Sequence, residues 1–421
     1  MLSLSDSKKH DHLSLEQRNK LKILNDPIYG FIAIPNALIF DLIEHSYFQR
    51  LRRISQMGLS YLVYPGAHHT RFHHAIGCMF LMQKAVQTFR MKGIEISEDE
   101  ATALCVAILL HDIGHGPFSH ALEHSIVTGI SHEDISLFYM KELNIEFSGQ
   151  LSLAIEIFEG KYPRKFMHQL ISSQLDMDRL DYLKRDSFYS GVAEGNINSE
   201  RLIAMLNVVN DELVLEEKGI YSAEKFIVGR RLMYWQVYLH KTGVVAEKML
   251  VNLLKRANDL ALKGEELPSS KAFKFFLENQ ISENNFDNET LKTFARLDDY
   301  DVLSGIKDWI SHDDFVLSTL SKMIINRQLL KIELSNEPIS QDYFEEIFTL
   351  KQKEMNLSTE ELAYFVFTDS VQNQAYDSSK SKINIYFKNG MIQDITEASD
   401  QLNIQALTKP VVKYFICYPK H

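Results

Sequence analysis

The chain has 421 residues, 45% of them hydrophobic, enough to bury a large core in one large domain or two to three smaller ones. Its formal net charge of -11 makes the average field repel polyanions, which disfavours a general nucleic-acid-coating protein. Its longest apolar stretches fall short of the ~20 residues of a bilayer span, and the first residues are too polar for a secretory signal, so we expect a cytoplasmic protein that does not enter a membrane.

The first half of the chain predicts helices after a polar start. Residues 1–25 are charged and predict a flexible N-terminal segment, and Asp26-Pro27 precedes a short strand expected within 28–34. Apolar residues then recur at helical spacing up to Gly58, over about 70–91, and from a Ser97 cap with Glu100 three residues later to His111. Further helices are expected over about 131–144, 150–158, 164–189, 198–209, 222–262, 269–279 and 288–333.

The last part of the chain changes character. Residues 365–368, 383–387 and 411–417 are rich in β-forming side chains, and Lys388-Asn389-Gly390 predicts a hairpin turn among them. The predicted fold class is therefore mainly α, with a helical core over 26–245, a helical extension over 246–334 and a small α+β module over 335–421. The cysteines Cys78, Cys105 and Cys417 lie apart in apolar segments and predict buried, reduced thiols.

The pair His111-Asp112 is a candidate metal site. A hard or borderline divalent ion needs imidazole and carboxylate ligands that share one space. Adjacent helical residues point about 100° apart, so both reach one ion only where the helix is distorted, and Gly114 and Gly116-Pro117 supply such an end. A lone His-Asp pair is also compatible with a simple capping interaction.

The wider motif resembles a known family. The string His111-Asp112-Ile113-Gly114-His115-Gly116-Pro117-Phe118-Ser119-His120 follows Arg71-Phe72-His73-His74 and resembles the HD superfamily. The longer run from Tyr47 to Gly58 and from Tyr64 to His74 is similar to the deoxynucleoside triphosphate (dNTP) triphosphohydrolases, which include the animal SAM-and-HD-domain enzyme and bacterial dGTPases. The resemblance covers roughly residues 26–245 and implies an HD-domain helical core; no SAM-type domain is visible.

The resemblance implies four metal ligands, His74, His111, Asp112 and Asp178. His73 competes with His74, and Asp176 and Asp181 compete with Asp178. Helical spacing supports Asp178, because it shares a face with Tyr182 and Asp186 while Asp181 can pair with Arg185 as a surface or second-layer salt bridge. The expected cofactor is at least one divalent ion per subunit, such as Mg, Mn or Fe, and His115 and His132 could recruit a second.

Catalysis of phosphoester hydrolysis also needs a proton for the leaving alkoxide. His120 is the candidate donor, because Glu123 at i+3 could hold its ring in one tautomer. His124 is the alternative, with a solvated helix residue as its plain role. His115 and His132 match family histidines that face the phosphates or their metals, although an isolated histidine such as His132 is often structural.

The resemblance also implies substrate contacts. Arginines at family positions for the triphosphate are Arg71, Arg179 and Arg230, whose guanidinium groups suit phosphate oxygens but would otherwise be ordinary surface charges. Positions where the family senses the deoxyribose are Gln56, Tyr182, Asp186 and Tyr238. Tyr238 belongs to an aromatic stripe that could equally be helix packing.

A regulatory surface is a further implication of the family pattern. Glu44, Gln49, Arg52 and Lys241 match positions at which the animal enzyme binds a nucleotide activator between subunits. This implies a nucleotide activator and a homo-oligomer, a dimer or a tetramer. The alternative is a solvated basic helix around Arg50, Arg52 and Arg53.

Three hypotheses follow. The first is hydrolysis of a dNTP to deoxynucleoside and inorganic triphosphate. The second is another HD phosphohydrolase, such as a nucleotide phosphodiesterase or nucleotidase, because four ligands alone do not choose a substrate. The third is a non-catalytic nucleotide-sensing scaffold, which the intact ligand and acid residues disfavour.

Overall fold

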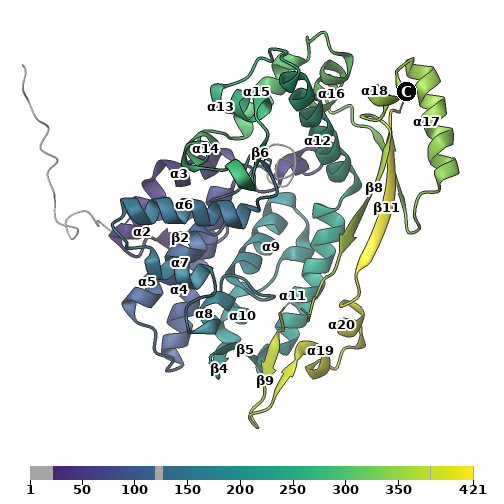
Figure 1. Ribbon diagram of the computed structural model, residues 1–421. Helices are drawn as coiled ribbons and strands as arrows, with labels where there is room; N and C mark the ends of the chain where they lie inside the picture. Colours follow the sequence, from purple (N-terminus) through teal and green to yellow (C-terminus); the bar gives the residue numbers. More distant parts are fainter. Residues whose placement is uncertain (1–21, 119–126, 380, 421) are drawn as a thin grey trace, which may run out of the picture.

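The computed structural model describes residues 22–118, 127–379 and 381–420, and these are mainly helical, as the sequence predicted (Figure 1). The α-helices are α2 (Ala37–Glu44), α3 (Ser46–Gln49), α4 (Arg71–Met91), α5 (Glu98–Leu110), α6 (His132–Glu146), α7 (Ser152–Phe158), α8 (Lys165–Gln169), α9 (Met177–Ser190), α10 (Ser199–Met205), α11 (Ile220–Met233), α12 (Lys241–Leu262), α13 (Lys271–Glu278), α14 (Asn288–Phe294), α15 (Asp299–Trp309), α16 (Phe315–Ile325), α17 (Gln341–Met355), α18 (Thr359–Leu362), α19 (Ile395–Ala398) and α20 (Leu402–Ala406). Short 3-10 or π turns are η1 (Arg50–Arg53), η2 (Gly58–Leu62), η4 (Ala193–Gly195), η5 (Glu217–Gly219), η6 (Tyr234–Tyr238) and η7 (Glu283–Asn285).

Short strands complete the described fold. They are β1 (Ile23–Asp26), β2 (Gly30–Ala33), β3 (Val127–Thr128), β4 (Leu206–Val209), β5 (Glu212–Glu216), β6 (Ile281–Ser282), β7 (Lys331–Ser335), β8 (Phe367–Asn373), β9 (Asn384–Tyr386), β10 (Ile392–Asp394) and β11 (Val411–Tyr418). The strand expected within 28–34 is β2, and it pairs with β1, which begins inside the segment that we expected to be flexible.

The helices that carry the metal motif form the centre of the molecule. α4 packs against both α5 and α9, and its buried residues lie all around it, so it is a core helix rather than an amphipathic surface helix. α5 begins at the predicted Ser97 cap, whose side chain accepts the Glu100 N–H while Glu100 accepts the Ser97 N–H. The predicted cap and start of this helix are therefore confirmed.

Four long predicted helices are each divided in the structure, and one of them, 288–333, forms α14, α15 and α16 and ends in the first residues of β7. The segment up to Gly58 forms α2, α3 and η1; the segment 164–189 is interrupted between α8 and α9; and the segment 222–262 contains the π turn η6. Residues 206–209 were expected to be helical but form β4. They turn back into β5 through Asn210 and Asp211, which both have positive φ, at 53° and 64°, as a tight hairpin requires.

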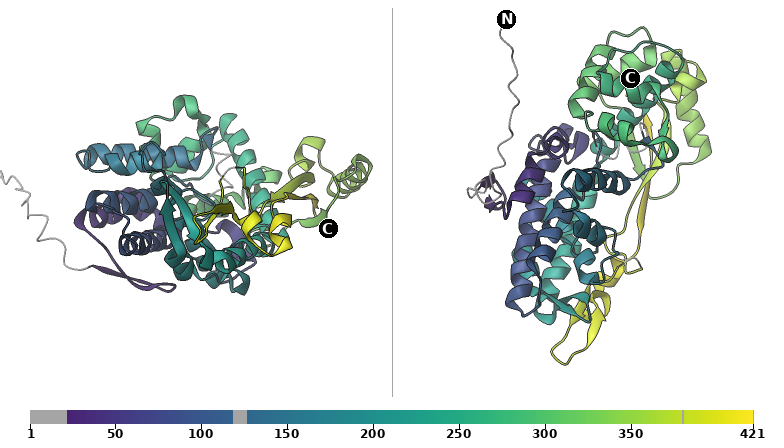
Figure 2. Two further views of the ribbon diagram at one scale, coloured as in Figure 1. Left: turned by 90° about the horizontal axis from the view of Figure 1, so that it is seen from below. Right: turned by 60° about the vertical axis from the view of Figure 1, so that its left-hand side comes forward.

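The C-terminal strands join two separate sheets. β11 lies between β7 and β8, and the hairpin β9–β10, with the predicted turn at Gly390, extends the sheet of β4 and β5. β9 pairs with β5 in parallel through Leu215 and Ile385, so the C-terminal segment runs along one side of the helical core (Figures 1 and 2). One hydrophobic cluster contains residues from Ile32 to Cys417. The proposed division of the chain into the parts 26–245, 246–334 and 335–421 remains a prediction.

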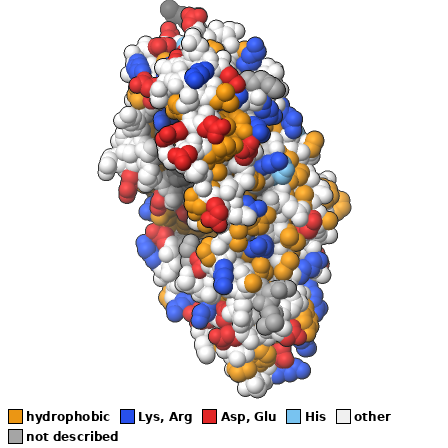
Figure 3. Space-filling view, turned by 90° about the vertical axis from the view of Figure 1, so that its right-hand side faces the viewer, with side chains coloured by type: hydrophobic (Ala, Val, Ile, Leu, Met, Phe, Trp, Pro, Cys, Tyr) orange, Lys and Arg blue, Asp and Glu red, His pale blue; other side chains and the backbone are white. Residues whose placement is uncertain are grey.

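The surface and the cysteines agree with the composition. The face that α17 and β11 help to form carries acidic, basic and hydrophobic side chains close together (Figure 3). Cys78, Cys105 and Cys417 are buried and free, as predicted. A search of the described residues for a helix of membrane-spanning length and apolarity finds none.

Candidate metal centre and substrate site

The turn after α5 brings His111 and Asp112 toward one point, and Gly114 makes this turn possible. A Cβ on Gly114 would lie 2.2 Å from the carbonyl oxygen of His132, because the start of α6 packs directly on the turn. Ser136 of α6 ties the two together, since its Oγ accepts the Gly114 N–H at 2.9 Å and donates to the His111 carbonyl at 2.7 Å. The distorted helix end expected from the sequence is therefore present.

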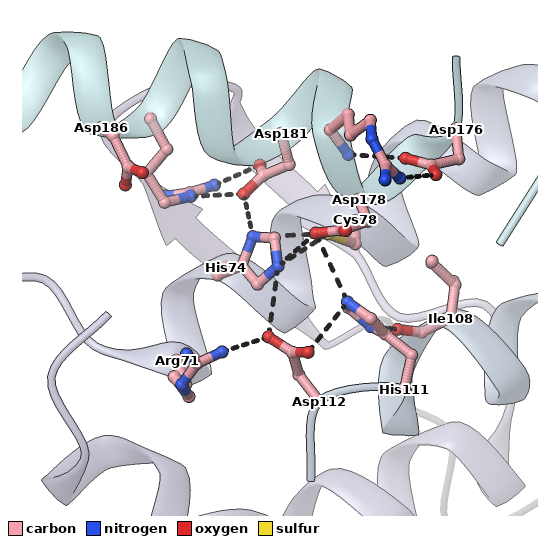
Figure 4. A network of polar contacts seen from close by, with 12 residues as sticks. Arg71, His74, Cys78, Ile108, His111, Asp112, Asp176, Asp178, Asp181 and Asp186 are labelled. Atoms are coloured by element: carbon pink, nitrogen blue, oxygen red, sulfur yellow. Dashed lines mark hydrogen bonds and ion pairs between the residues drawn. The ribbon is translucent and has the colours of Figure 1, made fainter. Parts of the chain in front are cut away.

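The four predicted metal ligands meet (Figure 4). His74 Nε2 lies 3.1 Å from Asp178 Oδ1 and 3.6 Å from Asp112 Oδ2. His111 Nε2 lies 3.4 Å from Asp112 Oδ1 and 3.5 Å from Asp178 Oδ1. Ligand atoms at such separations can share one ion, because metal–ligand bonds to nitrogen and oxygen measure about 2.0–2.2 Å. His111 Nε2 is buried and has no hydrogen-bond partner among the described residues, which fits a metal ligand.

The electrostatics of this cluster favour a bound cation. Burial alone would raise the pKa of Asp178 and Asp112, yet the nearby imidazoles hold both pKa values well below the usual range. Burial would lower the pKa of His74, but Cys78, Asp178 and Asp181 raise it. The cluster therefore holds ionised carboxylates beside histidines that take up positive charge, and a divalent ion could supply that charge instead. The chemistry of these donors suits a borderline divalent ion.

The rings of His74 and His111 are each oriented by a contact to their Nδ1 nitrogen. His74 Nδ1 lies 2.8 Å from Asp181 Oδ2, and His111 Nδ1 lies 2.6 Å from the carbonyl oxygen of Ile108. In each case the Nδ1–H is the donor, so Nε2 would be available to an ion, the usual arrangement around a metal. Asp181, which the sequence left as an alternative metal ligand, thus contacts Nδ1 of His74 and orients its ring.

A buried network supports Asp181. Arg185 donates to both Asp181 oxygens, at 2.9 and 3.0 Å, and also to Asp26 Oδ2 at 2.7 Å. The predicted Asp181–Arg185 pair is therefore present and is fully buried rather than on the surface. Gly77 admits this pair, because a Cβ there would lie 2.0 Å from Asp181 Oδ1. Sequence reasoning missed Gly77, although its position one turn after His74 was a signal.

Of two further side chains near the cluster, Cys78 contacts His74 and His73 does not. Cys78 was treated only as a buried thiol, but its Sγ lies 3.5 Å from His74 Nδ1, and it belongs with His74, His111 and Asp178 to a group that could hold a metal. Its position at i+4 from His74 could have shown this contact. Burial raises the pKa of the Cys78 thiol. The competing ligand candidate His73 instead faces Thr70, with its Nδ1 3.2 Å from the Thr70 N–H.

The remaining predicted catalytic histidines lie on the other side of Asp112. His115 Nδ1 is 3.4 Å from Asp112 Oδ1, and the His115 ring stacks on His132 at 3.9 Å between centroids. Asp112, His115 and His132 form a second group that could hold a metal. His120, Glu123 and His124 lie outside the described residues.

The predicted phosphate-binding arginines border the cluster and are paired with polar groups. Arg71 forms an ion pair with Asp112, and Arg179 forms one with Asp176, the N-cap of α9. Arg230 donates to Gln174 Oε1 at 2.9 Å. Asp176, the third competing aspartate, therefore caps α9 and holds Arg179 rather than facing His74 or His111.

The predicted sugar-binding residues meet around α9. Tyr238 donates its hydroxyl to Asp186 Oδ2 at 2.8 Å, and the Tyr182 and Tyr238 rings contact edge to face at 6.0 Å. The π turn η6 places Tyr238 here, and such turns are frequent at functional sites. Gln56 and Tyr238 line one cavity of about 110 Å³. His69 was missed: its Nε2 lies 2.7 Å from Asp186 Oδ1.

The predicted regulatory residues do not all meet. Arg52 donates to Gln49 Oε1 at 2.8 Å and lies 3.6 Å over the Phe72 ring, and Glu44 is exposed at the end of α2. Lys241 lines a separate cavity of about 240 Å³. Other cations that line this cavity are Arg327, Lys331 and Lys420.

Comparisons with known proteins agree with this geometry. The HD domain family matches residues 71–186, and the HD associated region matches residues 197–273. The crystal structure of a phosphohydrolase from Bacteroides thetaiotaomicron is 53% identical, with a TM-score of 0.92 over 95% of this chain and 100% of that chain.

Two curated relatives extend the comparison. The uncharacterized protein YwfO of Bacillus subtilis is 33% identical over 90% of this chain and 88% of its own length. A deoxynucleoside triphosphate triphosphohydrolase of Dictyostelium discoideum is 31% identical over 61% of this chain and 53% of its own length. With its HD motif in place, the chain belongs to the HD-domain phosphohydrolases, in the family related to the dNTP triphosphohydrolases.

Proposed function

We propose that this chain is a metal-dependent dNTP triphosphohydrolase, which cleaves a dNTP at its α-phosphate into a deoxynucleoside and inorganic triphosphate. The observation that carries the proposal is the row Asp178, Tyr182 and Asp186 on α9. Residues four apart on a helix are about 6 Å apart along its axis, so Tyr182 lies one turn and Asp186 two turns from the metal-ligand candidate Asp178. A phosphate at the metal cluster would therefore lie next to the sugar, and only the α-phosphate does so in a dNTP.

The residues around the cluster suit the chemistry of this reaction. A bound divalent ion would supply an activated water and neutralise phosphate charge. Arg71 pairs with Asp112 and Arg179 pairs with Asp176, and each guanidinium group can exchange its carboxylate partner for phosphate oxygens. His115 and His132 can donate ring N–H groups to the same phosphates. His120, oriented by Glu123, remains the proposed proton donor to the leaving alkoxide.

The test is a product assay on the purified full chain, with each dNTP and each ribonucleotide in Mg, Mn or Fe(II). We expect deoxynucleoside and intact triphosphate from dNTPs. Release of only orthophosphate or monophosphate would contradict the proposal and favour a nucleotidase or phosphodiesterase. A double variant, His111→Ala with Asp112→Ala, should be inactive while His312→Ala, outside the cluster, is active. A biological function that persists in the double variant would support the non-catalytic scaffold.

Nucleotide activation with oligomer formation is the regulatory part of the proposal. Its support is the cationic cavity at Lys241, which Arg327, Lys331 and Lys420 also line, because clustered Lys and Arg side chains suit phosphates. Preincubation with dGTP or dATP should raise both the rate and the mass measured by light scattering. Arg327→Ala should remove both responses. An unchanged mass and rate in the unsubstituted protein would argue against activation.

A further inference from the structure

A second feature of the sugar region is the cavity between η2 and the start of α12. It has a volume of about 110 Å³, and its walls include Gln56 and Tyr238 from the sugar-binding set. A cavity of roughly 150 Å³ holds a benzene ring, so this cavity would take a large part of a planar ring and leave the rest at its opening. Met57, Phe118 and Leu250 give it apolar walls.

Two acceptors in this cavity lack partners. Glu247 of α12 lines the cavity, is partly buried, and forms no hydrogen bond or ion pair with any residue that the structure describes. Gln56 Oε1 is buried and also has no hydrogen-bond partner in the described part of the chain. A buried acceptor without a donor is unfavourable, and this applies to Gln56 Oε1, whereas the partly buried Glu247 carboxylate is an open acceptor in the wall of the cavity; both are suited to a ligand that brings N–H or O–H donors. Their carboxylate and amide oxygens define what that ligand must offer.

We propose that this cavity receives the nucleobase of the substrate and that Glu247 selects guanine. The inference rests on the proposed function, because the base is the part of a dNTP attached to the sugar that Gln56 and Tyr238 would hold. An ionised carboxylate is an acceptor only. Guanine presents two adjacent donors, N1–H and the N2 amino group, which can pair with both oxygens of one carboxylate.

The other bases fit this carboxylate less well. Adenine and cytosine place a ring nitrogen acceptor beside their amino group, so one carboxylate oxygen would face a lone pair. Thymine has a single N–H between two carbonyl oxygens. A site built around hydrogen bonds rejects an analogue that leaves its buried polar groups unpaired, which gives Glu247 a strong basis for discrimination.

Gly243 offers a way to block the cavity without disturbing its neighbours. It lines the cavity on α12, and a Cβ built on it would meet nothing within 4 Å. Leucine is a good helix former, so Gly243→Leu should keep the helix and fill the space. Glu247→Gln keeps the volume of the side chain and replaces one acceptor with a donor.

The experiment has a binding arm and a hydrolysis arm on the purified full chain. Calorimetry measures the affinity for deoxyguanosine and deoxyadenosine, which lack phosphates and so test the cavity apart from any phosphate site. Hydrolysis of the four dNTPs gives kcat/KM for each base. We expect a preference for guanine in both arms and a loss of about 10- to 100-fold for guanine alone in Glu247→Gln. Gly243→Leu should weaken all nucleosides, and the exposed control Glu266→Gln should change nothing.

The outcomes separate the two proposals. Equal binding of both nucleosides by the unsubstituted chain, or equal losses for all bases in Glu247→Gln, would overturn the role of Glu247. Undiminished nucleoside binding in Gly243→Leu would overturn the cavity as the base site. Guanine-selective binding that depends on Glu247, without triphosphate release from any dNTP, would instead leave the base site standing and refute the triphosphohydrolase.

Discussion

The candidate metal cluster and the proposed base cavity are built in opposite ways, although Tyr182 and Tyr238 lie between them. In the cluster, His74 and His111 are each held by a bond to the second ring nitrogen, and Arg71 pairs with Asp112. In the cavity, Gln56 Oε1 and the Glu247 carboxylate have no bond to any described residue. Oriented ligands suit an ion that stays bound, whereas acceptors left open suit a ligand that enters and leaves at every cycle.

The largest expected effect on dNTP hydrolysis comes from removing one of the candidate metal ligands. His111→Ala should lower dNTP hydrolysis by on the order of 10³-fold or more, because Lewis-acid stabilisation by a metal is worth several kcal/mol. The measurement is kcat/KM under saturating Mn, with metal content determined in parallel. Full activity at an unchanged metal content would show that His111 is not a ligand.

Substitutions that disturb the Asp181 carboxylate, which orients His74, should have a smaller effect. Asp181→Asn and Gly77→Ala should each weaken metal affinity by about 10- to 100-fold, because His74 loses its oriented Nδ1 partner or the carboxylate is displaced. Calorimetric titration with Mn measures this directly. Asp314→Asn is the matched control, since it breaks the Asp314–Arg256 ion pair outside the cluster. A similar loss of affinity in that control would mean that general destabilisation is responsible.

Metal addition should also stabilise the fold. A ligand at 100 times its dissociation constant stabilises the native state by about 2.7 kcal/mol, so the midpoint of thermal unfolding should rise with Mn concentration. His111→Ala should abolish this rise. If the midpoint of thermal unfolding of the unsubstituted protein did not depend on Mn concentration, this would contradict metal binding at the cluster of His74, His111, Asp112 and Asp178.

The sugar residues between the two regions should give a smaller change. Tyr238→Phe removes one hydrogen bond to Asp186, worth about 1 kcal/mol, and so should reduce kcat/KM for dNTPs by roughly 5-fold. The ratio of dGTP to GTP hydrolysis reports whether sugar discrimination changes with it. Equal losses for both nucleotides would assign Tyr238 to packing, which was the alternative reading of the aromatic stripe.

The smallest effect, on the free energy of unfolding, is expected from breaking the control ion pair Asp314–Arg256. Burial would raise the pKa of Asp314, but hydrogen bonds from Arg256 lower it. A carboxyl whose pKa is lowered on folding stabilises the protein above its unfolded pKa of about 3.9 and loses that contribution as pH falls through the folded value. Asp314→Asn should therefore cost about 1 kcal/mol or less near pH 7 and less still toward pH 3. Equilibrium denaturation at several pH values tests this.

Local sequence was a sound guide where the signal is local. The Ser97–Glu100 capping box, the Gly390 turn and the helical row of Asp178, Tyr182 and Asp186 all depend on residues within a few positions of each other. The hairpin of β4 and β5 was missed because its first strand lies in a segment that also fits a helical pattern. The signal was Asn210-Asp211, a pair that tolerates positive φ.

Contacts between distant segments could not be read in this way. Asp26 and Arg185 are 159 positions apart, and Gly77 is needed only because Asp181 approaches from another helix. Glu247 gave no signal, because nothing in α12 alone says that a cavity lies beside it. The amino-acid pattern and the family resemblance predicted which histidines and aspartates would meet in one cluster, since short-range geometry and motif spacing carry that information. Which of these side chains are held, buried or left open was decided by the packing of α4, α9 and α12, because burial and hydrogen-bond partners exist only once distant segments meet.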